Sequence, residues 1–158
     1  MLVFGNNFDK RIDKAEFPVG LEHVTFGFSF NHPIDEVRWP RGLRQLFFHA
    51  RFDQPVEAVR WPAGLEVLRF GYNFNYPVES VVWPEALRQL TFGNEFDRPL
   101  KGVRWPPGLE KICFGYCFNQ AVVGVKWPVE LRRLTFGFAF NQPTRGITLP
   151  PKLNFVSF

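Results

Sequence analysis

The 158-residue sequence contains one methionine, two cysteines and three histidines. Two cysteines are too few for a disulfide-built domain, and no apolar run approaches the roughly 20 residues of a membrane-spanning helix. Basic and acidic residues nearly balance, at 19 and 15, so net charge alone identifies no partner. Because no apolar targeting stretch opens the chain, we expect an intracellular, cytoplasmic protein that does not enter a membrane.

Phenylalanine, in contrast, is abundant and regularly spaced. One series of Phe residues recurs every 22 residues without insertion or deletion, at Phe4, Phe26, Phe48, Phe70, Phe92, Phe114, Phe136 and Phe158. Starting at Leu21, the unit reads L-x-x-L-x-F-G-x-x-F-N-x-P-V-x-x-V-x-W-P-x-G, and its residues are numbered here as repeat positions 1 to 22. The whole chain is therefore a tandem array.

The repeat predicts a mainly β fold. Pro, Gly and aromatic residues every few positions exclude a sustained helix, whereas the alternating stretch Leu68–Phe70 is typical of a short strand that ends at Gly71. Because one unit cannot bury its own Leu, Phe and Trp side chains, neighbouring units must stack and bury them together. We predict a parallel β-solenoid of about seven 22-residue coils spanning residues 1–158.

Repeat position 11 alternates between Asp and Asn along most of the array. Such side chains can hydrogen-bond free backbone groups of a turn, so we expect a structural ladder with one rung in each coil. Its predicted members are Asn31, Asp53, Asn75, Asp97, Asn119 and Asn141.

Three strings of residues resemble a known family: Leu90-Thr91-Phe92-Gly93, Phe30-Asn31-His32-Pro33-Ile34 and Phe140-Asn141-Gln142-Pro143. They are similar to the FNIP repeat, a 22-residue relative of the leucine-rich repeat, and the resemblance covers essentially the whole chain. Trp-Pro stands here where many members have Leu-Pro. The resemblance implies a leucine-rich-repeat-like solenoid with a binding or scaffolding role, and it supplies no catalytic residue.

The sequence contains no recognisable catalytic or metal-binding constellation. His23, His32 and His49 fall at different repeat positions, and Cys113 and Cys117 are two thiols where a structural zinc site needs four ligands. A ladder of carboxylates at repeat position 15 lies near Arg38, Arg60 and Arg104, which predicts ion pairs on a convex face. We therefore expect no enzymatic activity and no cofactor.

If the protein binds a partner, the contact should use outward strand residues and the aromatic residues just after the strands. Aromatic residues and Arg are enriched in protein interfaces. The candidate partner-binding residues are Phe47, Arg69, Tyr72, Tyr116 and Phe138. Alternatively, these rings only stack on one another between coils.

Other interpretations concern the ends and the charge of the array. Unpaired strands at both ends favour a structural or self-assembling unit, or else a segment of a longer array. The second half of the chain is more basic than the first, but its cations are few and have acidic neighbours, so we do not expect nucleic-acid binding. An ice-binding surface needs an unbroken row of small residues, which Phe47 and Arg69 interrupt.

Overall fold

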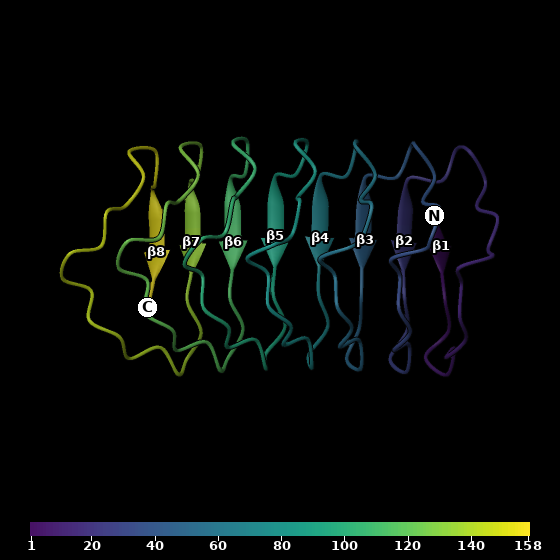
Figure 1. The fold of residues 1–158 in the computed structure, drawn as a ribbon, viewed down its shortest axis with the longest axis horizontal. Coiled ribbons are helices and arrows are strands. Elements are labelled where there is room, and N and C mark those ends of the chain that lie inside the picture. Colours follow the sequence, from purple (N-terminus) through teal and green to yellow (C-terminus); the bar gives the residue numbers. More distant parts are fainter.

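The computed structural model describes residues 1–158 as one eight-stranded parallel sheet without helices (Figure 1). Hydrogen bonds join the strands in chain order, and each residue pairs with the residue 22 positions later, as Leu46 does with Leu68. The predicted leucine-rich-repeat-like β-solenoid of about seven coils is confirmed. The strands are β1 (Leu2–Val3), β2 (His23–Thr25), β3 (Gln45–Phe47), β4 (Val67–Arg69), β5 (Gln89–Thr91), β6 (Lys111–Cys113), β7 (Arg133–Thr135) and β8 (Phe155–Ser157).

Each strand is short because only repeat positions 3 to 5 are fully paired. The sequence predicted a strand over Leu68–Phe70, and the structure places β4 one residue earlier. The N–H of Phe70 nevertheless donates a 2.9 Å hydrogen bond to the carbonyl of Thr91, so the ladder continues into repeat position 6. Gly71 then turns the chain away from the sheet.

The interior consists of stacked aromatic ladders. The buried core cluster contains 36 residues. Phe70 and Phe74 of one coil lie 3.9 Å apart between ring centroids, and each also stacks on its equivalents in the neighbouring coils. Burying one such side chain contributes roughly 1.5–3 kcal/mol, so the repeated stack stabilises coils that could not fold alone.

The wall opposite the sheet is built from turns and carries a Trp ladder. Trp61, Trp83, Trp105 and Trp127 stack with centroid spacings of 6.3–6.5 Å. Trp83 is 6% exposed, and the buried indole Nε1 atom of each Trp has no hydrogen-bond partner. The Trp side chains therefore stabilise this wall by packing on one another and not through side-chain hydrogen bonds.

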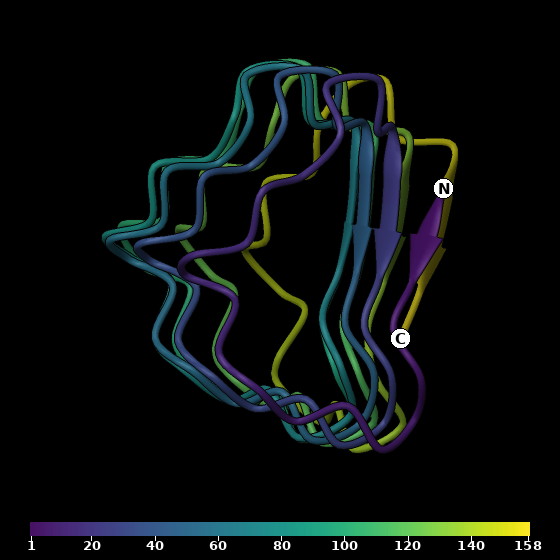
Figure 2. The same ribbon diagram turned by 90° about the vertical axis from the view of Figure 1, so that its right-hand side faces the viewer.

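The coils fan out away from the sheet. Neighbouring strands lie about 4.8 Å apart, whereas rings of the Trp ladder are 6.3–6.5 Å apart. Figure 2 shows the consequence: the end coils curve toward the strand side, which makes the sheet the concave face. The structure has no helix with the length and apolar character needed to cross a membrane.

Candidate partner-binding surface

The concave strand face consists of the side chains at repeat positions 3 and 5, because the residues between them at position 4 point into the core. None of these outward strand residues is Asp or Glu, although the chain contains 15 acidic residues. Arg69, Lys111 and Arg133 are the face's Arg and Lys residues. The concave strand face is therefore a cationic surface on a nearly balanced chain.

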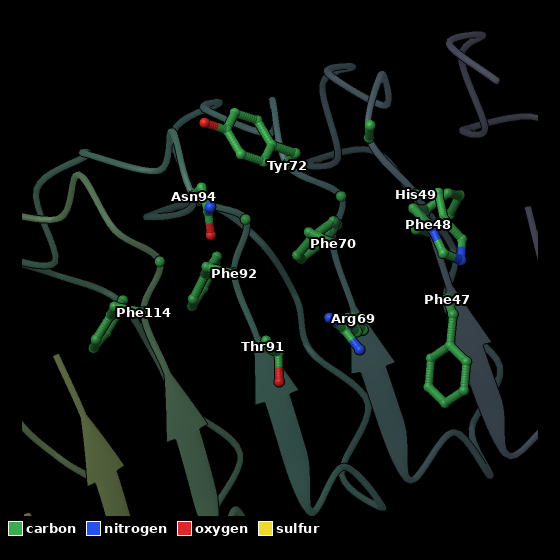
Figure 3. A pocket seen from close by; sticks show the side chains of 14 residues that line it. Phe47, Phe48, His49, Arg69, Phe70, Tyr72, Thr91, Phe92, Asn94 and Phe114 are labelled. Carbon is green, nitrogen blue, oxygen red and sulfur yellow. The ribbon is translucent and has the colours of Figure 1, made fainter. Parts of the chain in front are cut away.

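A hollow of about 410 Å³ lies over the end of β3, β4 and β5 on this face (Figure 3). Phe47 stands on one side, Arg69 lies beside it, and Tyr72 lies at the upper rim, while Thr91 and Asn94 line the far side. We call this feature the central hollow. Three of the five predicted binding residues, Phe47, Arg69 and Tyr72, thus line the same concavity.

Phe47 and Arg69 are register partners on β3 and β4, and Arg69 is followed by Thr91 on β5. The Arg69 side chain is exposed and makes no ion pair or hydrogen bond within the chain. Tyr72 is 51% exposed. The central hollow therefore presents an unpaired guanidinium beside the ring of Phe47, with the ring of Tyr72 at the rim.

The central hollow also contains side chains that are unusual for their repeat positions. Repeat position 5 is otherwise occupied by Val, Thr, Cys or Ser, and Phe47 and Arg69 interrupt that series. Repeat position 7 is Gly in every coil except at His49, which also lines the hollow. Sequence reasoning missed His49 as a candidate, although the broken glycine column was a signal that could have identified it. Functional sites are where regular structures break their own local rules.

Tyr116 and Phe138 form a separate feature nearer the C-terminus. Their rings stack with centroids 5.1 Å apart and planes 14° apart, and neither residue lines the central hollow. Phe138 is 83% exposed. The two predicted binding residues therefore pack on each other, as the alternative interpretation envisaged, while leaving much of their surface open to solvent.

The residues at repeat position 11 form a chain of side-chain to backbone hydrogen bonds. The Oδ1 atom of Asn75, for example, accepts a 2.9 Å hydrogen bond from the N–H of Asp97, and the N–H of Asn75 donates to Oδ1 of Asp53 at 3.0 Å. The same contact links each rung to the next through Asn31, Asp53, Asn75, Asp97, Asn119 and Asn141. Alternation keeps carboxylates two coils apart, about 10 Å at the strand spacing.

Residues at repeat position 12 add donors to this ladder. Gln54 Nε2 donates to Oδ1 of Asn31, Gln120 Nε2 to Oδ1 of Asp97, and each of these bonds is 2.9 Å long. His32 belongs to the same column, and its Nε2 atom lies 3.1 Å from Oδ1 of Asp9 without the geometry of a hydrogen bond. The contact of His32 with a carboxylate is thus part of the repeated ladder.

Ion pairs are fewer than the sequence suggested. The predicted pairs between the position-15 carboxylates and Arg38, Arg60 and Arg104 are absent: these three Arg residues are exposed without an acidic partner, and the position-15 residue Asp13 pairs with Arg11 instead. Opposite charges instead meet at repeat position 2, where Arg44 pairs with Glu66.

Local partners shift the pKa values of three groups. A hydrogen bond from Arg11 lowers the pKa of Asp13, and one from Lys152 lowers the pKa of Glu130. Burial, followed by the nearby charge of Glu95, raises the pKa of the Cys117 thiol. Both cysteines are free, and no group of three or more His, Cys, Asp or Glu side chains is arranged to hold a metal ion.

Comparisons with known proteins agree with this architecture. The model of the FNIP Repeat matches residues 52–95. The crystal structure of CroV588, described as a novel circular LRR protein structure, is 28% identical with a TM-score of 0.66; the match covers 98% of this chain and 29% of that chain. No curated protein matches the sequence.

The molecule is therefore a leucine-rich-repeat-like solenoid. Residues 52–95 match the FNIP Repeat, the family that the sequence resembles, and the same 22-residue spacing continues on both sides of the matched residues. Because this chain spans less than a third of the CroV588 chain, the likeness describes an arc of that molecule. Repeat family and fold together suggest a protein-interaction or scaffold module, a class that is typically non-enzymatic.

Proposed function

We propose that the protein is a non-enzymatic module that binds another protein through its concave strand face. The observation that carries this proposal is the clustering of Phe47, His49 and Arg69, which are unusual for their repeat positions, around the central hollow. Side chains that only maintain a solenoid are expected to resemble their equivalents in the other coils. Unusual side chains gathered at the middle of an exposed, curved face are better explained by contact with a partner.

The composition of the surface supports the same proposal. Protein interfaces are enriched in aromatic residues and Arg, and their energetically dominant residues cluster near the centre of the contact. Phe47, Arg69 and Tyr72 have these identities and occupy a central place on the face. Both cysteines are free thiols, which is the usual state in the reducing cytosol, so they are compatible with the intracellular, cytoplasmic location that we infer.

Site-specific photo-crosslinking tests the proposal. A benzophenone amino acid is placed at Thr91 on the concave strand face or, as the control, at Val82, which is 79% exposed on the opposite wall. We expect one protein to crosslink at Thr91 and not at Val82, and the adduct to form again with that protein purified. Adducts at Val82 alone, or at neither position, would overturn the proposal.

Self-association through the ends is a second candidate. The outer edges of β1 and β8 are unpaired, and Val156 and Phe158 are partly exposed beside them. Unpaired edges of this kind can add another strand. Light scattering after size exclusion tests this candidate: mass that grows with protein concentration supports it, whereas a concentration-independent monomer contradicts it.

A further inference from the structure

We propose that the central hollow binds an acidic segment of the partner protein, with an aromatic side chain of that segment held between Phe47 and Tyr72 and a neighbouring carboxylate paired with Arg69. This inference rests on the proposed function and specifies the chemistry of the partner. Neither the family nor the overall fold determines that chemistry, because Phe47 and Arg69 occupy a repeat position that the pattern leaves free.

Charge is the first argument. The 14 residues that line the hollow include Arg69 and His49 but no Asp or Glu. Arg69 has no ion-pair partner within the chain, and its neighbours across the strands, Phe47 and Thr91, cannot neutralise it. A guanidinium offers a rigid set of donors that matches a carboxylate in two-pronged fashion. An incoming carboxylate would therefore gain an ion pair without displacing an internal one.

Shape and apolar character are the second argument. The volume of about 410 Å³ falls within the range of sites that enclose a ligand or a side chain. Phe47 and Tyr72 border this volume, and the rings of both are partly exposed. Aromatic rings favour offset-stacked or edge-to-face contacts with centroids about 4.5–7 Å apart. Tyr116 occupies the same repeat position as Tyr72, and its ring stacks on Phe138 with centroids 5.1 Å apart. An aromatic ring can therefore pack beside a side chain at this position.

Two other occupants fit less well. A second copy that docked with its own concave strand face would bring Arg69, Lys111 and Arg133 and no acidic residue, so like charges would meet. A nucleic acid requires several phosphate contacts for strong binding. The hollow itself offers Arg69 as its single fixed cation, and Arg133 already lies over the ring of Phe155 at 4.8 Å. An acidic protein segment satisfies the available groups best.

Selection from a random peptide display library on the immobilised, full chain tests this inference. We expect the wild-type chain to enrich peptides in which Phe, Tyr or Trp lies within two residues of Asp or Glu. The variant Arg69→Glu should enrich peptides with Lys or Arg in place of the acidic residue, while the aromatic preference remains. Arg60→Glu, a charge reversal on the opposite wall, is the matched control and should select the same peptides as the wild type.

Affinity measurements on the enriched peptide complete the test. Phe47→Ala and Arg69→Gln should each weaken binding roughly ten-fold, the size expected for one packed ring or one charged hydrogen bond. The proposal is overturned if Arg69→Glu selects the same peptides as the wild type, if no peptide is enriched, or if a labelled single-stranded oligonucleotide binds more tightly than the peptide. Crosslinking at Thr91 would still succeed in any of these cases if the broader function is correct, so the two proposals fail separately.

Discussion

Phe47 and Arg69 lie directly across from each other on β3 and β4, where the other coils have small side chains. Cross-strand neighbours in a parallel sheet lie about 4.8 Å apart, so these two residues form one local surface rather than two isolated exceptions. This pair, with Tyr72 at the rim, accounts for the distinct character of the central hollow.

The double variant Phe47→Ala with Tyr72→Ala should lose partner binding and remain folded. Both rings are partly exposed, so we expect the free energy of unfolding to change by no more than about 1 kcal/mol. Urea unfolding and peptide binding are the measurements. Phe70→Ala is the contrasting variant, because Phe70 is buried and its loss should cost about 3–5 kcal/mol. A double variant as unstable as Phe70→Ala would place Phe47 and Tyr72 in the core.

The ladder at repeat position 11 should require an acceptor atom rather than a charge. Asp53→Asn keeps the oxygen that accepts from the N–H of Asn75, so we expect little change in stability. Asn75→Ala removes the acceptor for the N–H of Asp97 and should cost about 1–3 kcal/mol. Chemical unfolding of the two variants is the test, and equal losses would show that the charge of Asp53 contributes as much to stability as the acceptor atom of Asn75.

The sequence predicted the architecture well because every coil repeats the same constraints. Phe70, Phe74 and Trp83 recur in kind at fixed spacing, and only a stacked parallel array buries all of them. Which exposed residues come together was harder to predict. Tyr72 and Tyr116 share a repeat position, yet only Tyr72 lines the central hollow, because that concavity depends on its neighbours Phe47 and Arg69. The absent ion pairs at Arg38 and Arg60 have a similar reason: long exposed side chains gain little from pairing in water.

Gly93 should be intolerant of a side chain, unlike the glycine at the same repeat position in the first coil. A Cβ atom at Gly93 would overlap the carbonyl oxygen of Gly71, whereas nothing lies within 4 Å of one at Gly5. We expect Gly93→Ala to cost about 1–3 kcal/mol or more through overpacking, and Gly5→Ala to be nearly neutral. Thermal unfolding compares them. His49 already has a side chain at this repeat position. If Gly93→Ala were as neutral as Gly5→Ala, neighbouring coils would be able to move apart and accept a Cβ atom at this position in every coil.

Trp83 should accept Phe far better than Ala. Its ring fills the wall opposite the sheet, and Trp83→Ala should cost about 3–5 kcal/mol through the cavity that it leaves. Phe keeps most of the stacking and removes a buried indole N–H that has no acceptor, and Phe17 already occupies the same repeat position in the first coil. Denaturant unfolding measures both variants. Equal losses would indicate that the N–H interacts with an aromatic face, such as that of Phe70 at 6.4 Å in edge geometry.

Cys117 should react slowly with alkylating reagents until the pH is above that needed for an ordinary thiol. Burial and the charge of Glu95 both disfavour the thiolate and raise the pKa of Cys117. In a Cys113→Ser background, the rate of reaction with iodoacetamide as a function of pH reports this thiol alone. We expect Glu95→Gln to lower the pKa of Cys117 only in part, because the larger contribution, burial, remains.

The same shift links Cys117 to stability. The thiol of the unfolded chain loses its proton at a lower pH than the folded thiol, so raising the pH through the ordinary cysteine range should favour unfolding. Glu95→Gln should reduce this alkaline loss, and Cys117→Ser should abolish it. A Cys117 rate profile that matches free cysteine would contradict the burial of the thiol and, with it, the close approach of Cys117 Sγ to Glu95 at 3.8 Å.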